Sequence, residues 1–320
     1  MAFRFKLGEA IEKGFRRIGV EQIERARALL IARQEPEIEV HEARKCIKRT
    51  RALLRLGRIG LGETIYRAEN AHFRSIAAAL SSARDDYVLL ETVLKLIAAD
   101  DGKTGAALAR LKEAVLAQRF LEPNGAANGR VDATAALERA LRRFRRLTLE
   151  PDNFETLEQG LVRNYRKALK RRAAAYAETT DEAFHDWRKC VQTHQRHMAL
   201  LSKPWPPLFE AHVEAARELS QILGDDHDLA VLRQRMSALP ADMLSADDIK
   251  EIESLIAARQ RSLRLAAKPR GDIVFAERPK SHGRRIAAIW AGAKTEDPED
   301  ADTEMTALPK RSRAKAHARG

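Results

Sequence analysis

A motif made of a histidine, a basic pair and a cysteine occurs twice in this chain, about 144 residues apart. The first copy is residues 41–46 (HEARKC) and the second is residues 185–190 (HDWRKC). A second block follows each copy some forty residues later, at residues 80–89 and 223–232. A repeat with so long a period indicates a duplicated structural unit. The duplicated unit therefore carries charged groups at fixed places as well as an apolar pattern.

Apolar residues recur at helical spacing through most of the chain, and no segment shows a convincing strand pattern. Alanine, leucine, arginine and glutamate dominate the composition, while aromatic residues make up 5%. These abundant residues lose little side-chain freedom in a helix. The sequence therefore predicts an all-α fold that is interrupted at glycines and prolines. Helices are expected at approximately 8–33, 39–57, 63–99 with a bend at the serine pair, 103–121, 131–147, 154–178, 181–202, 206–223, 227–238 and 246–267.

Pro151 divides the two copies of the repeat and marks the predicted boundary between two halves. We expect residues 1–150 to form an N-terminal helical-bundle repeat and residues 151–268 to form a C-terminal one. Periodicity fades beyond this point, so residues 269–320 are expected to be a largely disordered extension. One docking helix is expected within it, carried by Ile286, Ile289 and Trp290.

The two cysteines, Cys46 and Cys190, occupy matching positions in the repeat, and the chain has no Cys-x-x-Cys pair. A zinc site built on cysteine is therefore not expected, and both thiols are predicted to be reduced and buried rather than joined in a disulfide. No apolar run approaches the roughly 20 residues that a membrane-spanning helix needs. The N-terminus lacks the apolar stretch of a signal peptide. These features predict a cytoplasmic protein without a membrane span.

The formal net charge is +12, which favours an anionic partner such as nucleic acid, a phosphate polymer or a membrane surface. Four cations on the helix of the first copy fall within about 60° of one another around the helix axis. They are Arg44, Lys48, Arg51 and Arg55, here called the basic stripe. His41 lies beside these four cations, and Lys45 flanks them. No carboxylate occurs from Lys45 to Gly62, although solvated helix faces usually interleave glutamate with lysine or arginine. We therefore predict that the basic stripe binds an anion.

The second copy keeps the start of this pattern and loses its end. The retained residues are His185, Arg188 and Lys189. The three later cations are replaced by uncharged residues, Gln192, Gln195 and Ala199. The N-terminal half is therefore expected to be the stronger cation surface.

Further cations on other helices extend the predicted site. The helix that opens the second half places four of them on one face, Arg163, Arg166, Lys167 and Lys170. Arg17 lies in a similar pattern on the helix that opens the first half. The two repeat histidines, His41 and His185, are expected to donate hydrogen bonds to the anion and to gain charge beside it.

Two carboxylates, Asp85 and Asp228, also recur, and each admits two interpretations. As catalytic groups they would move a proton; as structural groups they would brace a repeat arginine or cap a helix after a bend. No second carboxylate or nucleophile accompanies them in a repeated motif, which favours the structural role. His194 and His197 have a spacing found among metal ligands, but the first copy has no histidines there, so neither metal nor another cofactor is expected.

Taken together, the two motifs resemble the CHAD family, the conserved histidine α-helical domain. The residues that carry the resemblance are His-x-x-Arg-Lys with the basic residues after it, and the Arg-Asp-x-x-Val-Leu block that begins at Arg84. The second copy has His227-Asp228 in place of Arg-Asp. The resemblance covers residues 5–267 and adds Arg84 to the expected site. Some family members carry an N-terminal triphosphate-tunnel domain, which is not expected here because the chain begins directly with the helical part.

The resemblance implies two pseudo-symmetric four-helix bundles, derived from an internal duplication, around a basic central groove or pore. It also implies non-catalytic binding of inorganic polyphosphate and association with polyphosphate granules. No enzyme activity and no cofactor are therefore expected. The oligomeric state does not follow from the sequence.

Three classes of function remain open for such a surface. A polyphosphate-binding module is favoured because no aromatic residue interrupts residues 41–58, and binders of single-stranded nucleic acid usually stack bases on aromatic rings. A nucleic-acid-binding protein is the second choice, since duplex binding needs only phosphate contacts. A metal-dependent enzyme acting on phosphate polymers is the third. It would need a carboxylate cluster to hold Mg²⁺, and none is repeated.

Overall fold

The computed structural model describes residues 3–32, 34–80, 85–100, 102, 104–119, 125–240 and 242–295. Across these ranges all regular secondary structure is helical, which confirms the predicted all-α fold. None of these helices is both long and apolar enough to cross a membrane. In chain order they are α1 (Ile11–Ala32), α2 (Pro36–Leu56), α3 (Arg58–Leu61), α4 (Glu63–Ala79), α5 (Asp85–Ala99), α6 (Gly105–Arg119), α7 (Gly125–Phe144), α8 (Phe154–Glu178), α9 (Asp181–Leu200), α10 (Pro206–Met236), α11 (Ala246–Val274) and α12 (Pro279–Thr295).

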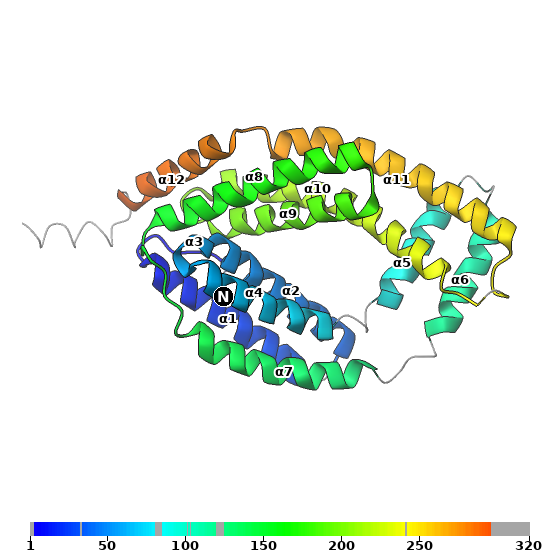
Figure 1. The fold of residues 1–320 in the computed structure, drawn as a ribbon, viewed down its shortest axis with the longest axis horizontal. Helices are drawn as coiled ribbons and strands as arrows, with labels where there is room; N and C mark the ends of the chain where they lie inside the picture. The colour runs from blue at the N-terminus through cyan, green and yellow to red at the C-terminus, as the bar shows by residue number, and fades with distance from the viewer. Residues whose placement is uncertain are drawn as a thin grey trace, which may run out of the picture.

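The first half of the chain packs four of its helices around one apolar core. α1 contacts α2 and α7, and α4 contacts the same two helices, so the four are joined as a ring of neighbours (Figure 1). Phe15 stacks on Phe144 with 5.5 Å between ring centroids, and Phe73 meets Phe144 edge-on at 6.5 Å. All three side chains are fully buried. Rings of this size dominate the apolar area that such a core removes from water.

The hairpin of α5 and α6 leaves this bundle and packs on α10 and α11. Figure 1 shows it at the opposite end of the molecule from α12. Its apolar side chains share a second core with α10 and α11, formed by Leu89, Val93, Leu96, Leu108, Leu111, Leu232 and Ile256 among others. Packing in this part of the chain therefore departs from the predicted N-terminal unit of residues 1–150. The pseudo-symmetry of two bundles and the central pore remain predictions.

α8, α9, α10 and α11 pack in series in the second half, with Trp187 fully buried between them. α10 is one helix of 31 residues, so the two separate helices predicted at 206–223 and 227–238 were wrong. Gly224 lies inside α10 and not at a break. A Cβ at this position would lie 2.9 Å from Nη2 of Arg188, so the glycine makes room for that guanidinium.

α11 continues through Pro269 to Val274, so the predicted end of this helix at residue 267 was wrong. This proline is on the exposed side of the helix. A proline inside a helix leaves the backbone oxygen four residues earlier without its usual donor. The predicted docking helix is confirmed as α12, whose Trp290 is buried and stacks on Phe154 at 5.0 Å between centroids. The prediction of disorder from residue 269 is therefore wrong for the described part of this segment, which ends at residue 295. Residues 296–320 lie outside the described ranges.

Cys46 in α2 and Cys190 in α9 are free thiols and both are buried, as predicted. Burial raises the pKa of each thiol. Because only the thiolate is a good nucleophile, these cysteines contribute packing and not reactivity.

α8 approaches the end of α2 closely at Gly160. A Cβ there would lie 1.9 Å from the backbone oxygen of Leu56, a clash that no side-chain rotation relieves. Changing Gly160 to alanine is therefore expected to lower the free energy of unfolding by at least about 2 kcal/mol, measured by urea denaturation. Gly292→Ala is the matched control, because a Cβ at Gly292 meets nothing within 4 Å. Equal stabilities of the two variants would contradict the close approach.

Candidate functional site

A pocket of about 430 Å³ opens where the two halves of the chain meet. α2, α3 and α4 form one side of it and α8 and α9 form the other, and α2 contacts both α8 and α9. Eight of its lining residues are cations: Arg51, Arg55, Arg58, Arg74, Arg163, Lys167, Arg171 and Lys189. Five of these eight were predicted from the sequence, namely Arg51, Arg55, Arg163, Lys167 and Lys189. We call this the basic pocket.

Among the described residues that line the basic pocket, Asp186 is the single carboxylate. It lies 3.2 Å from the guanidinium of Arg171 and also pairs with Lys189. Burial opposes its charge, but the hydrogen bond from Lys189 and the charge of Arg171 hold the pKa of the Asp186 carboxyl below its usual value. One carboxylate thus pairs with two of the eight cations, and a third, Arg58, pairs with Glu63 at 2.6 Å outside the lining. The pocket keeps an excess of positive charge.

Two arginines show what this excess costs the free protein. Burial, together with the nearby charges of Arg55 and Arg74, lowers the pKa of Arg51 to about 10. Burial and the neighbouring arginines, Arg55 first among them, lower the pKa of Arg196 to about 10. A lowered arginine pKa means that the surroundings disfavour the cation, because burial removes its water without supplying a carboxylate. An anion in the pocket would remove this penalty.

Neutral donors complete the lining of the basic pocket. Asn164 is 7% exposed, and its Nδ2 is buried without a hydrogen-bond partner. Within the part of the chain that the structure describes, no carboxylate lies at ion-pair distance from Arg74, Arg163 or Lys167.

The start of the basic stripe lies beyond the pocket lining. Arg44 donates from Nη1 to the backbone oxygens of Leu80, at 2.7 Å, and Ala77, at 3.3 Å, and so joins α2 to the end of α4. Lys45 pairs with Glu42 at 2.6 Å on its own helix. The two ends of the basic stripe therefore differ. Arg44 at its start holds α2 against α4, and Arg51 and Arg55 at its end line the pocket.

The repeat motif of the second half has a similar division. Lys189 lines the pocket, whereas Arg188 reaches α10 and lies 4.0 Å from Asp228. This contact is the one that the structural interpretation of Asp228, as a brace for a repeat arginine, predicts. His185 stacks on His227 with 3.8 Å between ring centroids. Arg84 lies outside the described residues, and α5 begins at Asp85.

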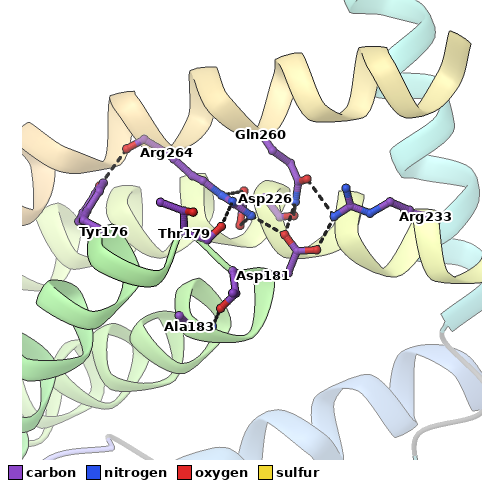
Figure 2. Close-up of polar contacts among 9 residues, drawn as sticks. Tyr176, Thr179, Asp181, Ala183, Asp226, Arg233, Gln260 and Arg264 are labelled. Carbon is purple, nitrogen blue, oxygen red and sulfur yellow. Dashed lines mark hydrogen bonds and ion pairs between the residues drawn. The ribbon is translucent and has the colours of Figure 1, made fainter. Parts of the chain in front are cut away.

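A network of paired charges fixes the start of α9, as Figure 2 shows. Asp181 pairs with Arg233 of α10 and Arg264 of α11, and Nε of Arg264 lies 2.7 Å from Oδ1 of Asp226. Gln260 donates to Oδ1 of Asp181 at 3.1 Å. Burial works against the charge of Asp181, yet the two arginines hold its pKa below the usual value. Two carboxylates here face two guanidiniums, so this network is balanced, unlike the basic pocket, and it holds α9 against α10 and α11.

Three further predicted cations, besides Arg44, Lys45, Lys48 and Arg188, are not in the pocket lining. Arg17 is held by Glu9 and by Glu21 on α1. Arg166 and Lys170 are exposed on α8, on the other side of Arg163 from the pocket. On α8 the pocket is therefore lined by the face that carries Arg163, Lys167 and Arg171, and Arg166 and Lys170 lie to one side of this face.

His194 and His197 are fully buried in α9. Nε2 of His197 lies 3.0 Å from the backbone oxygen of Ala52 in α2, so this ring joins the two halves of the chain. Burial lowers the pKa of both rings, to about 3 for His197. In the described ranges no group of three or more histidine, cysteine or carboxylate side chains is arranged to hold a metal ion.

Sequence reasoning left several pocket cations out of the predicted site. They are Arg58, Arg74 and Arg171. The spacing of Arg163, Lys167 and Arg171 at four-residue steps was available in the sequence and indicates one helix face. Arg74 and Arg58 come from helices that only the tertiary fold brings to α8.

Comparison with protein-family models finds a match to the model described as CHAD domain, over residues 17–237. The matched segment is more than half of the chain and includes both copies of the histidine motif and all the helices that line the basic pocket. A search of curated proteins finds no match.

Proposed function

Because the chain belongs to the CHAD family, we propose that it binds inorganic polyphosphate, without catalysis, in the basic pocket between its two halves. The observation that carries the proposal is the charge of that pocket, with eight cations and one carboxylate among its lining residues. Burying cations without carboxylates costs free energy in the free protein. A bound phosphate chain would supply the negative charge that these cations lack, and this would stabilise the complex.

The pocket suits a polymer of phosphates better than a nucleic acid. Tyr66 is the one aromatic residue among the described lining residues, and the guanidinium of Arg58 covers its ring at 4.3 Å from the centroid. The ring is therefore not available for a base to stack on, a contact worth about 1–3 kcal/mol per base. Arginine and lysine at several angles around one pocket match phosphate oxygens, which are present at every unit of polyphosphate.

The lining residues also favour binding over catalysis. Phosphoryl transfer normally uses carboxylates to hold Mg²⁺ against the phosphates. Asp186 is the candidate for that role in the described pocket, and it is already shared by Arg171 and Lys189. We therefore propose that polyphosphate recovered from the protein keeps its length. In a cell, such binding would place a cytoplasmic protein at polyphosphate granules.

The experiment that tests the proposal is a binding titration with polyphosphates of defined length at two salt concentrations, followed by competition with duplex DNA. The proposal requires that long polyphosphate displaces the duplex at equal phosphate concentration. A duplex that resists displacement would instead support the nucleic-acid alternative. Shortening of the chains in the presence of Mg²⁺, lost in Asp228→Asn, would support the enzyme alternative.

The unequal charge of the two halves gives a paired prediction. Lys48 in the first copy corresponds to Gln192 in the second. One phosphate contact contributes about tenfold in affinity at 0.1 M salt. Lys48→Gln is therefore expected to weaken polyphosphate binding by roughly tenfold, and Gln192→Lys to strengthen it by a similar factor. Isothermal titration calorimetry measures both. A Gln192→Lys variant that binds no better than wild type would show that this position of the second half does not meet the phosphate chain.

A further inference from the structure

His185 and His227 form a stacked pair of imidazole rings. Their centroids are 3.8 Å apart and their planes differ by 23°. His185 lies on α9 one turn before Lys189, a lining residue of the basic pocket, and its Nδ1 is buried without a hydrogen-bond partner. Asp181 and Asp226 of the network in Figure 2 lie within one turn of the two histidines, so both helices are fixed beside the pair.

The two halves of the chain differ at the position that His227 occupies. The first half has Arg84 there, whose charge is permanent, and the second half has a histidine, whose charge depends on pH. The same half has lost the later cations of the basic stripe, which Gln192 and Gln195 replace. The repeat histidine of the second half therefore has a titratable partner where the first half has a fixed cation.

Charged groups from three helices surround the pair. They are Lys48 on α2, Asp181, Asp186, Arg188 and Lys189 on α9, and Asp228 on α10. Burial, and then the charges of Lys189 and Arg188, lower the pKa of His185 to about 4. Burial, and then the neighbouring His185, lower the pKa of His227 to about 4. Both rings are neutral near pH 7 in the free protein.

We propose that the His185–His227 pair couples anion binding to proton uptake, so that the protein binds polyphosphate more tightly as the pH falls. This inference rests on the proposed function and adds a regulation to the same site. A phosphate chain that reaches Lys189 brings negative charge beside the rings, and an opposite charge within about 4–6 Å raises a pKa by about 1–3. Because two imidazolium rings stacked at 3.8 Å would repel each other, the pair takes up about one proton.

Proton uptake fixes the sign of the pH dependence. A group whose pKa is higher in the complex than in the free protein binds protons as the complex forms. Affinity therefore rises as the pH falls below the pKa of the complex, and it levels off below the pKa of the free protein, about 4. A rise of one pKa unit corresponds to tenfold in affinity once the pH is below both pKa values. A rise of about two units, the middle of the expected range, therefore predicts that wild-type affinity increases by roughly tenfold from pH 8 to pH 5.

The test is a titration with long-chain polyphosphate at pH 5, 6.5 and 8 and constant ionic strength, because the internal phosphates keep one charge across this range. His227→Arg copies the first half, and it is expected to bind at pH 8 about as tightly as wild type binds at pH 5, with little further change. His227→Gln is expected to flatten the pH profile at the weaker level. His72→Gln, on the exposed side of α4, is the matched control and should keep the wild-type profile.

Each outcome bears on one of the two proposals. An affinity that is equal at pH 5 and pH 8 in wild type would overturn the coupling and leave polyphosphate binding in place. A full pH dependence in both His227 variants would assign the proton to other groups and overturn the role of the pair. Absence of binding at every pH would instead refute the proposed function. A nuclear magnetic resonance titration of the imidazoles gives a direct readout, in which saturation with polyphosphate should raise the midpoints of His185 and His227.

Discussion

Changing Arg51, Arg55 and Arg163 to glutamate in one variant is expected to abolish polyphosphate binding. These side chains line the basic pocket from both halves of the chain, two from α2 and one from α8. If polyphosphate behaves as nucleic acids do, each phosphate contact contributes about tenfold in affinity at 0.1 M salt. Three lost contacts therefore weaken binding by about a thousandfold, and the three new carboxylates add repulsion. The measurement is a titration with long polyphosphate, together with circular dichroism to follow helix content.

The matched control has the same change in charge at a different place. Arg139 and Arg142 are exposed on α7, and Arg146 is exposed in the turn that follows it. Changing all three to glutamate alters the net charge by the same amount. Charges separated by more than about 10 Å are largely screened at 0.1 M salt, so this variant should lose much less affinity. Equal losses in the two triple variants would show that net charge, and not the basic pocket, controls binding. Position 51 is half-buried, so a glutamate there could unfold the protein. The variant with glutamine at all three pocket positions removes the same charges without adding carboxylates, and its loss of affinity therefore tests the pocket in a folded protein.

The helices were predictable from the sequence because their periodicity is local. The bounds of α8 and the start of α9 agree with the prediction, and both follow from capping positions and proline. The failures arose where a usual helix breaker is tolerated. Gly224 lies inside α10 because it makes room for Arg188, and Pro269 lies inside α11 on its exposed side. The first reason depends on the position of the neighbouring helix and the second on which side of the helix faces solvent, and the sequence of the helix itself gives neither.

The site was predictable in part for a similar reason. The basic stripe could be recognised on one helix, and its second part, Arg51 and Arg55, does line the pocket. The stacking of His185 on His227 joins residues of two helices, and the contribution of Arg74 depends on the packing of α4 beside α2. Sequence projection treats each helix alone, so it finds charged faces and misses the residues that another helix brings to them.

The strength of polyphosphate binding is expected to fall steeply with salt. Each contact between a cation and a polymeric anion releases counterions, so the logarithm of affinity decreases linearly with the logarithm of salt concentration. Eight cations line the pocket. Three of them are already paired with carboxylates, Arg58 with Glu63 and both Arg171 and Lys189 with Asp186. The other five predict a slope of about −3.5 to −4.5, which is a loss of roughly two to three decades in affinity between 50 and 200 mM salt. Fluorescence anisotropy with labelled polyphosphate across this range measures the slope.

The slope also counts the contacts and so distinguishes the pocket from a diffuse surface. Arg163→Gln removes one contact and should make the slope less steep by about one, whereas Arg139→Gln on the outer face of α7 should leave it unchanged. Added Mg²⁺ should weaken binding, because it competes for phosphate oxygens and the one described pocket carboxylate, Asp186, is already paired with Arg171 and Lys189. A shallow slope near −1, or binding that Mg²⁺ strengthens, would mean that the phosphate chain is held by a bridging metal or by few cations, and the assignment of the basic pocket would fail.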